Sequence, residues 1–245
     1  DIELKDVTED YCVFGLFGPK SRELMSDIST DDFSGREFKF ATAKNINING
    51  MNIWAQRLSY VGELGFELFV KTNESKNLYE LIMKNGKNYN ISNCGMHAMD
   101  IMRMESGFLH WGHDISPEEN QYEAGLGFTV SFKKNVNFIG KEALSKIKDK
   151  KQNKRFVMLS LKNSEPGNPL LLHDEPIYLD DKIIGRTTSG NFSFNFSKNL
   201  SFGYISSNLK NEELLNRNLY IEIAKEKYLA IIETKPLKDK NIRLS

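Results

Sequence analysis

A charged stretch at residues 146–155, Lys-Ile-Lys-Asp-Lys-Lys-Gln-Asn-Lys-Arg, divides the sequence into two parts with different hydrophobic patterns. The part before it mixes helical and strand-like periods. The part after it consists of short apolar runs separated by Gly, Asn and Asp, a spacing typical of a small β-barrel or sandwich. We therefore predict two domains, at 1–148 and 149–245. The strands predicted in the second part are 156–161, 177–179, 182–188, 200–205, 219–224 and 228–233.

The first part is predicted to combine antiparallel strands with helices. Residues 11–17 form an apolar strand-like run, and Gly18-Pro19 then opens a helix, because proline is favoured in a first helical turn. Asn49-Gly50 is a strong hairpin signal, since both residues tolerate positive φ. The sequence therefore predicts an α+β fold. The remaining predicted elements are a helix at 21–29, hairpin strands at 38–48 and 51–60, a strand at 66–70 and helices at 75–84 and 95–106.

The composition limits the classes of partner. Thirty-three basic and thirty-three acidic side chains cancel, so no net charge draws the chain to nucleic acid or to an anionic membrane surface. The longest apolar runs are far shorter than the roughly 20 residues that cross a bilayer. Cys12 and Cys94 form no spaced disulfide framework, and both are expected to be reduced. We expect a soluble, cytoplasmic protein that binds neither nucleic acid nor membrane.

The segment Arg57–Glu67, Arg-Leu-Ser-Tyr-Val-Gly-Glu-Leu-Gly-Phe-Glu, predicts a ligand site on a hairpin. If Gly62 and Gly65 bracket a two-residue turn, Tyr60 stands opposite Glu67 on the same face, with Cβ atoms about 4.5–5.5 Å apart. An aromatic ring beside an acceptor-only carboxylate suits a flat heterocycle with two N–H groups on one edge, such as a pterin. The alternative is an ordinary cross-strand pair at a sheet surface.

Glu63 and Phe128 are two further candidates for contact with such a ligand. Glu63 competes with Glu67 as the ligand carboxylate, but its place at the turn predicts exposure to solvent, so Glu67 is preferred. In Glu-Ala-Gly-Leu-Gly-Phe, at 123–128, the glycines would let the backbone approach a ligand and let Phe128 cover it. A core phenylalanine is the alternative there.

The sequence does not support a zinc site, a hydrolase active site or a nucleotide-binding site. His110, His113 and Asp114 lie close together, but a zinc site needs about three or four converging ligands, and the other histidines lie in other elements. We therefore predict no metal and a loop whose side chains bond to backbone. The sequence contains no Gly-x-Ser-x-Gly turn of the hydrolase type and no phosphate-loop pattern, and no Gly-x-Gly-x-x-Gly follows a strand at the start of the chain. A flavin or nicotinamide would have to bind outside these residues.

Five motifs follow one another along the chain: Arg-Leu-Ser-Tyr-Val-Gly-Glu-Leu-Gly-Phe-Glu-Leu (57–68), Ala-Met-Asp-Ile-Met-Arg-Met-Glu-Ser-Gly (98–107), His-Trp-Gly-His-Asp-Ile (110–115), Tyr-Glu-Ala-Gly-Leu-Gly-Phe (122–128) and Phe-Ile-Gly-Lys-Glu-Ala-Leu (138–144). In this order they resemble one family, that of the folate-binding aminomethyltransferases. The third and fourth motifs are most similar to the C-terminal portion of dimethylglycine and sarcosine dehydrogenases.

The resemblance implies a partial T-protein-like folate-binding domain followed by a small C-terminal β-barrel. It implies a tetrahydrofolate site, and five residues match the family's pterin-contacting positions: Tyr60, Glu67, Leu68, Phe69 and Phe128. In such dehydrogenases an upstream FAD domain oxidises a small N-methyl amine, and tetrahydrofolate captures the one-carbon unit as 5,10-methylenetetrahydrofolate. FAD is thus expected only in an upstream domain, joined covalently or non-covalently to this chain.

The sequence departs from the family pattern in two places. Only ten residues precede Tyr11, whereas the family has its Asn-Asp segment and catalytic aspartate before this strand. We therefore expect no catalytic residue here and interpret the chain as part of a larger protein. Met99 replaces an arginine of the T-proteins, and Arg103 is expected to pair with Asp100 or Glu105. The alternatives are a non-catalytic folate-binding or regulatory module and a flavin-independent, folate-dependent demethylase or aminomethyltransferase.

Overall fold

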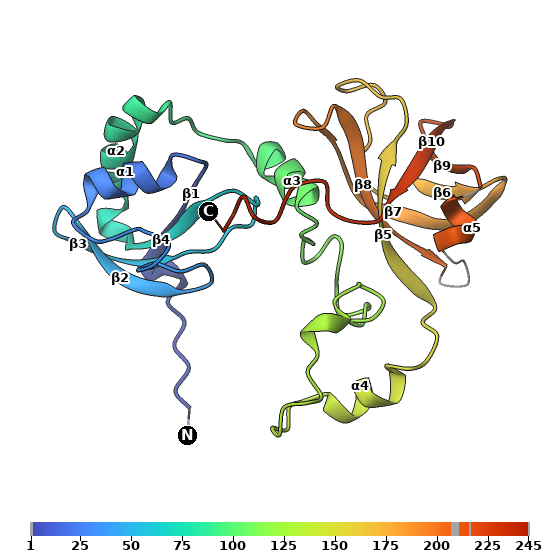
Figure 1. The fold of residues 1–245 in the computed structure, drawn as a ribbon, viewed down its shortest axis with the longest axis horizontal. Coiled ribbons are helices and arrows are strands. Elements are labelled where there is room, and N and C mark those ends of the chain that lie inside the picture. Colours follow the sequence, from blue (N-terminus) through green and yellow to red (C-terminus); the bar gives the residue numbers. More distant parts are fainter. Residues whose placement is uncertain (1, 207–210, 216, 245) are drawn as a thin grey trace. The chain divides into compact units, whose positions relative to one another are not determined.

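The computed structural model describes residues 2–206, 211–215 and 217–244, which form two compact units (Figure 1). Unit 1 comprises Asp1–Met99 together with Lys238–Ser245, and unit 2 comprises Asp100–Leu237. The chain therefore returns to unit 1 after unit 2 is complete. Within the described ranges, the helices are too short or too polar to cross a membrane.

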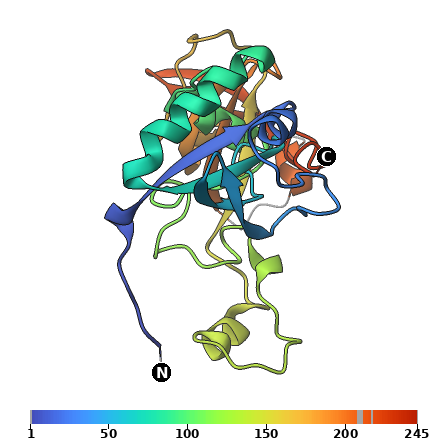
Figure 2. The ribbon, with the colours of Figure 1, turned by 90° about the vertical axis from the view of Figure 1, so that its left-hand side faces the viewer.

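Unit 1 is a four-stranded antiparallel sheet with two helices on one face (Figures 1 and 2). Its elements are β1 (Tyr11–Phe17), α1 (Ser21–Ile28), β2 (Ala43–Ile48), β3 (Met51–Gln56), β4 (Gly65–Lys71) and α2 (Ser75–Gly86), and α3 (Met96–Glu105) leads into unit 2. The order across the sheet is β1-β4-β3-β2. Alternate residues of each strand therefore point toward the helices or away from them.

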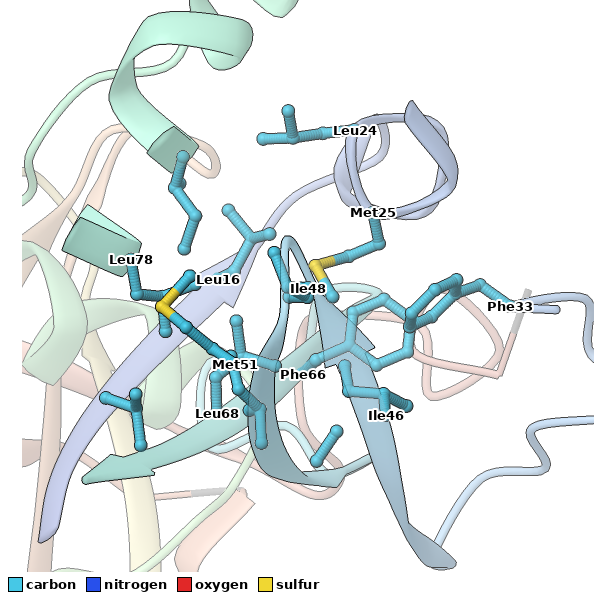
Figure 3. Close-up of a cluster of buried hydrophobic side chains, with 14 of the residues drawn as sticks. Leu16, Leu24, Met25, Phe33, Ile46, Ile48, Met51, Phe66, Leu68 and Leu78 are labelled. Atoms are coloured by element: carbon cyan, nitrogen blue, oxygen red, sulfur yellow. The ribbon is translucent and has the colours of Figure 1, made fainter. Parts of the chain in front are cut away.

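The core of unit 1 lies between the sheet and the helices (Figure 3). Phe66 and Leu68 of β4 are fully buried there, together with Leu24 of α1 and Leu78 of α2. Burial of an apolar side chain of this size contributes about 1.5–3 kcal/mol, so this cluster is the main stabilising element of the unit. It also fixes the register of β4, because a slip by one residue would move Glu67 into the core.

The predicted hairpin at Asn49-Gly50 is confirmed. Asn49 has a φ of 49° and Gly50 a φ of 84°, and Ile48 pairs with Met51 directly beside the turn. Two successive positive φ angles are the signature of a type I′ turn, whose twist matches that of the strands. The second strand is shorter than predicted, however. It ends at Gln56 and not at Tyr60.

Unit 2 contains a closed barrel of six strands in the order β10-β5-β8-β7-β6-β9. Together with the helices and antiparallel sheet of unit 1, it confirms the predicted α+β class with a small C-terminal barrel. Because the six-stranded sheet closes on itself, this part is a barrel and not a sandwich. The barrel interior is filled by aliphatic side chains of all six strands. The elements are α4 (Lys141–Ile147), β5 (Lys154–Leu161), β6 (Pro176–Leu179), β7 (Lys182–Ser193), β8 (Lys198–Ser206), α5 (Asn211–Leu215), β9 (Leu219–Ile223) and β10 (Glu226–Glu233).

A buried ion pair joins α3 to the barrel within unit 2. Arg103 and Asp114 are 1% exposed each, and their side chains bond to one another. Arg103 Nη2 also donates to Ser189 Oγ of β7 over 2.6 Å, and Asp114 Oδ1 accepts from Ser189 Oγ at 2.7 Å and from Thr188 Oγ1 at 2.6 Å. Arg103 Nη2 lies 2.7 Å from an Asp100 oxygen, which confirms one of its two predicted partners.

The loop that carries Asp114 was predicted to bond to backbone, and this is confirmed in part. Asp114 Oδ2 accepts from the main-chain N–H of His110 over 2.9 Å. Its partnership with Arg103 was not predicted, since eleven residues separate the two in sequence. The other predicted partner of Arg103, Glu105, instead accepts hydrogen bonds from Ser193 and Asn195.

Candidate functional site

The candidate site is the face of the unit 1 sheet that points away from the helices. Glu67 lies there in the middle of β4, half-buried, and its burial raises the pKa of its carboxyl group. Among the described residues, no hydrogen bond or ion pair involves the Glu67 carboxylate. A carboxylate that is partly removed from water and has no partner in the protein is suited to accept hydrogen bonds from a ligand.

The predicted pairing of Tyr60 with Glu67 is wrong. Gln56 stands opposite Glu67, and Tyr60 lies half-buried in the connection formed by residues 57–64. Arg57, the first residue after β3, is held on both its main chain and its side chain. Its main-chain N–H donates to Thr42 O over 2.9 Å, and its buried guanidinium donates to the main-chain oxygens of Phe38 and Leu244. Tyr60 stays a predicted ligand contact, but not through this register.

The 57–64 connection is also held by the C-terminal segment of unit 1. Lys238 forms an ion pair with Glu63 and donates to Val61 O over 3.3 Å. The prediction that Glu63 is exposed to solvent is therefore wrong, since its side chain is 20% exposed and that of Lys238 is 6% exposed. Glu63 has its charge compensated within the protein and Glu67 has not, which favours Glu67 as the ligand carboxylate.

Replacing Lys238 by methionine is expected to lower the free energy of unfolding of unit 1 by about 1–3 kcal/mol, because Glu63 would keep a largely buried charge without its partner. In a Trp111→Phe background, urea unfolding followed by the fluorescence of Trp54, which lies in β3 of the same unit, measures this. Lys240→Met is the matched control, since Lys240 is exposed on the same segment and should change stability by less than about 0.5 kcal/mol. Equal effects of the two substitutions would contradict the assignment.

Two glycines on the Glu67 face make room for an aromatic ring that sequence reasoning missed. Gly15 of β1 pairs with Glu67, and Phe17 pairs with Gly65 of β4. A Cβ atom at Gly15 would lie 2.5 Å from Phe17 Cε2, and one at Gly65 would lie 2.3 Å from Phe17 Cδ1. The Phe17 ring thus covers both glycines. Glycine inside a strand often marks a close approach, which was the available signal.

The other predicted site residues lie in three different settings. Leu68 is fully buried in the core, so its side chain points away from Glu67. Phe69 is half-buried on the Glu67 face, where it pairs with Val13 and Trp54. Phe128 belongs to unit 2, in a 3₁₀ turn at Gly127–Thr129, with 84% of its surface exposed. The roles of all three as ligand contacts stay predictions.

Comparison with family descriptions gives two matches. Residues 1–134 match the family described as the GCVT N-terminal domain. Residues 154–239 match the one described as the glycine cleavage T-protein C-terminal barrel domain. The second match contains all six barrel strands.

Comparison with individual proteins also finds similar sequences. The chain is 35% identical over 240 residues to the mitochondrial dimethylglycine dehydrogenase of Homo sapiens, with 97% of this chain and 27% of that protein covered. It is 33% identical over 203 residues to the mitochondrial sarcosine dehydrogenase of Mus musculus, covering 83% of this chain and 22% of that protein. The chain thus spans about a quarter of the length of these relatives.

The fold also has a close counterpart among solved structures. The crystal structure of glycine cleavage system aminomethyltransferase T from Bartonella henselae superimposes with a TM-score of 0.79. The match covers 94% of this chain and 60% of that one. Since the sequences are only 21% identical, this likeness concerns the fold alone.

Proposed function

The chain belongs to the glycine cleavage T-protein family, and we propose that it is the tetrahydrofolate-binding part of a flavin-dependent N-methyl amine dehydrogenase. Its domains are of the folate-dependent aminomethyltransferase type and are related to dimethylglycine and sarcosine dehydrogenases. In this proposal, the one-carbon unit removed from the amine is transferred to tetrahydrofolate to give 5,10-methylenetetrahydrofolate. The oxidation itself takes place in a flavin domain outside residues 1–245.

The observation that carries the proposal is the state of Glu67. A pterin presents adjacent N–H donors on one edge, and an ionised carboxylate is the acceptor-only group that fits two such donors at once. Glu67 offers both oxygens, because no described residue bonds to them, and it lies on an accessible sheet face with aromatic neighbours. These residues therefore fit the pterin end of the ligand.

The roles of the protein groups follow from this placement. Glu67 would fix the orientation of the pterin, and Tyr60 and Phe69 would contact its ring. When bound, tetrahydrofolate supplies the amine nitrogens that accept the carbon unit. A ligand held in a fixed orientation and away from water favours transfer over hydrolysis of the carbon unit. No general acid or base is assigned within this chain, since the family's aspartate is expected upstream.

The proposal is tested by product analysis on the complete natural protein. Dimethylglycine or sarcosine is supplied with and without tetrahydrofolate, and both formaldehyde and 5,10-methylenetetrahydrofolate are measured, together with flavin absorbance. The expected result is flavin reduction and a shift from formaldehyde to the folate product. Folate binding without any product would instead support the non-catalytic module. Methyl transfer without flavin would support the flavin-independent alternative.

The affinity for tetrahydrofolate is expected to fall as the pH is lowered from neutral through the pKa of Glu67. Burial raises that pKa, so the carboxyl group takes up a proton at a higher pH than an exposed glutamate does, and the protonated form loses its acceptor character. Donors on the ligand stabilise the charged form, so binding lowers the pKa and releases protons. Calorimetry in two buffers of different ionisation enthalpy measures that release.

Glu67→Gln is the control for this pH dependence, because glutamine does not titrate. The variant is expected to bind weakly with no proton release, and the remaining pH dependence is that of the ligand itself. A pH profile that is the same in both proteins would contradict the role of Glu67.

In the free protein, the raised pKa of Glu67 affects the stability of the fold in the opposite direction to its effect on ligand affinity. The fold loses stability as the pH rises through the pKa, because the charged form is the one that burial disfavours.

A further inference from the structure

The ring of Phe17 reaches across two neighbouring strands on the Glu67 face. Its Cδ1 corner meets the place where Gly65 would carry a Cβ atom, at 2.3 Å, and its opposite corner, Cε2, meets the corresponding place at Gly15, at 2.5 Å. The line between these opposite corners therefore runs along the sheet surface from β4 to β1, and the ring fills the space that side chains at both glycines would need. Phe17 is half-buried, so part of the ring is accessible.

The ring and the Glu67 carboxylate are neighbours on this face. Glu67 is the cross-strand partner of Gly15, and it lies two residues beyond Gly65 on β4, so it borders both glycines under the ring. Directly opposed strand residues have Cβ positions about 4.5–5.5 Å apart. The edge of the ring therefore lies beside the stem of Glu67.

We propose that Phe17 is the aromatic surface on which the flat ring of the ligand stacks while its N–H edge faces Glu67. The inference deepens the proposed function and rests on it. An aromatic ring beside a carboxylate is the arrangement that Tyr60 was expected to supply, and in the structure the ring next to Glu67 is that of Phe17. Because Gly15 and Gly65 lack side chains, the Phe17 ring packs closely against both of them. Little conformational freedom of this side chain therefore remains to be lost on binding.

Phe17→Leu tests the stacking directly in the complete natural protein. The affinity for tetrahydrofolate, measured by calorimetry, is expected to fall about three- to tenfold, since aromatic pairs contribute beyond their buried area. Tyr11→Leu is the matched control. Tyr11 lies on the same face of the same strand and is 37% exposed, but it pairs with Lys71 at the other end of β4, so its change is expected to stay within about twofold.

Ligand fragments separate stacking from a general structural effect. A reduced pterin without the p-aminobenzoylglutamate tail is expected to lose affinity by the same factor as tetrahydrofolate, and p-aminobenzoylglutamate alone is expected to lose none. An equal loss for the tail fragment would overturn the proposal. Phe17→Met serves if the leucine variant folds poorly, because it keeps an unbranched apolar side chain without the ring.

Gly15→Ala provides a second test that does not alter Phe17 itself. The three atoms nearest to the added Cβ would all belong to the Phe17 ring, at 2.5–3.4 Å, so the methyl group should displace the ring and weaken binding by a similar factor. In the Phe17→Leu background the same substitution is expected to have no further effect. An equal loss in both backgrounds would mean that the methyl group acts on Glu67, and it would overturn the role of Phe17.

The outcomes also distinguish this inference from the proposed function. If the wild-type protein binds no folate, the proposed function fails and the inference fails with it. If the wild-type protein binds folate and Glu67→Gln weakens binding, but Phe17→Leu does no more than Tyr11→Leu, the function stands and only the stacking role of Phe17 is contradicted.

Discussion

Replacing Arg103 by methionine is expected to lower the free energy of unfolding of unit 2 by about 3–5 kcal/mol. The substitution preserves much of the apolar side chain but leaves Asp114, which is 1% exposed, with a buried charge and without its ionic partner. It also removes the donor to Ser189 on β7, and with it a link between α3 and the barrel. Such a loss is a large fraction of the stability of a typical domain.

The measurement needs a signal from unit 2 alone. The chain has two tryptophans, Trp54 in unit 1 and Trp111 in unit 2. In a Trp54→Phe background, Trp111 is the only indole and lies three residues from Asp114, so its fluorescence during urea unfolding follows the unit that contains the ion pair.

Arg186→Met is the matched control for Arg103→Met. Arg186 also lies on β7 and pairs with an aspartate, Asp174, over 3.0 Å, but both side chains are well exposed, at 71% and 61%. An exposed pair of this kind contributes about 0–1 kcal/mol. Similar losses for the two arginines would show that burial of the Arg103 pair does not set its contribution.

Replacing Glu67 by glutamine is expected to weaken tetrahydrofolate binding by about ten- to a hundredfold, or about 1.5–3 kcal/mol. The substitution keeps the size of the side chain but exchanges an ionic acceptor for an amide that presents a donor to one of the ligand's N–H groups. Calorimetric titration of the complete protein measures the change. Unchanged affinity in a protein that binds folate would remove Glu67 from the site.

Stability measurements separate this effect from misfolding. Burial disfavours the charged form of Glu67, so a neutral side chain at this position should leave the melting temperature unchanged or raise it. Glu80→Gln is the matched control, since Glu80 lies on α2 with its side chain 62% exposed. It should change neither the stability nor the affinity noticeably.

Local patterns predicted the elements of this fold well, because the forces that decide them act between neighbours. The Asn49-Gly50 turn requires two positive φ angles, and these residues accept them at low cost. The alternation Phe66, Glu67, Leu68, Phe69 places Glu67 on the accessible face once the core is on the other side. These parts of the candidate site could be read from the sequence.

The parts that were missed depend on partners far away in the chain. The connection between Gln56 and Glu67 is held by Arg57, whose guanidinium bonds to Leu244 O, 187 residues later, and by the Glu63–Lys238 pair, 175 residues apart. No local pattern encodes such contacts. The position of the Phe17 ring against Gly15 and Gly65 was missed for the same reason. It arises only when two strands that are distant in sequence pair side by side.

The return of the C-terminal segment to unit 1 has a consequence for folding during synthesis. The residues that hold Arg57 and Glu63, Leu244 and Lys238, follow the barrel in sequence, so unit 1 cannot acquire all of its contacts until the barrel has been translated. Within unit 2, Leu237 packs against the cluster that contains Ile101, so folding of unit 2 brings its two ends together. Without that folding, the return of the chain to unit 1 would require the closure of a very long flexible loop, which costs more entropy than the closure of a short one. We expect the barrel to fold first, so that damage to it delays completion of unit 1.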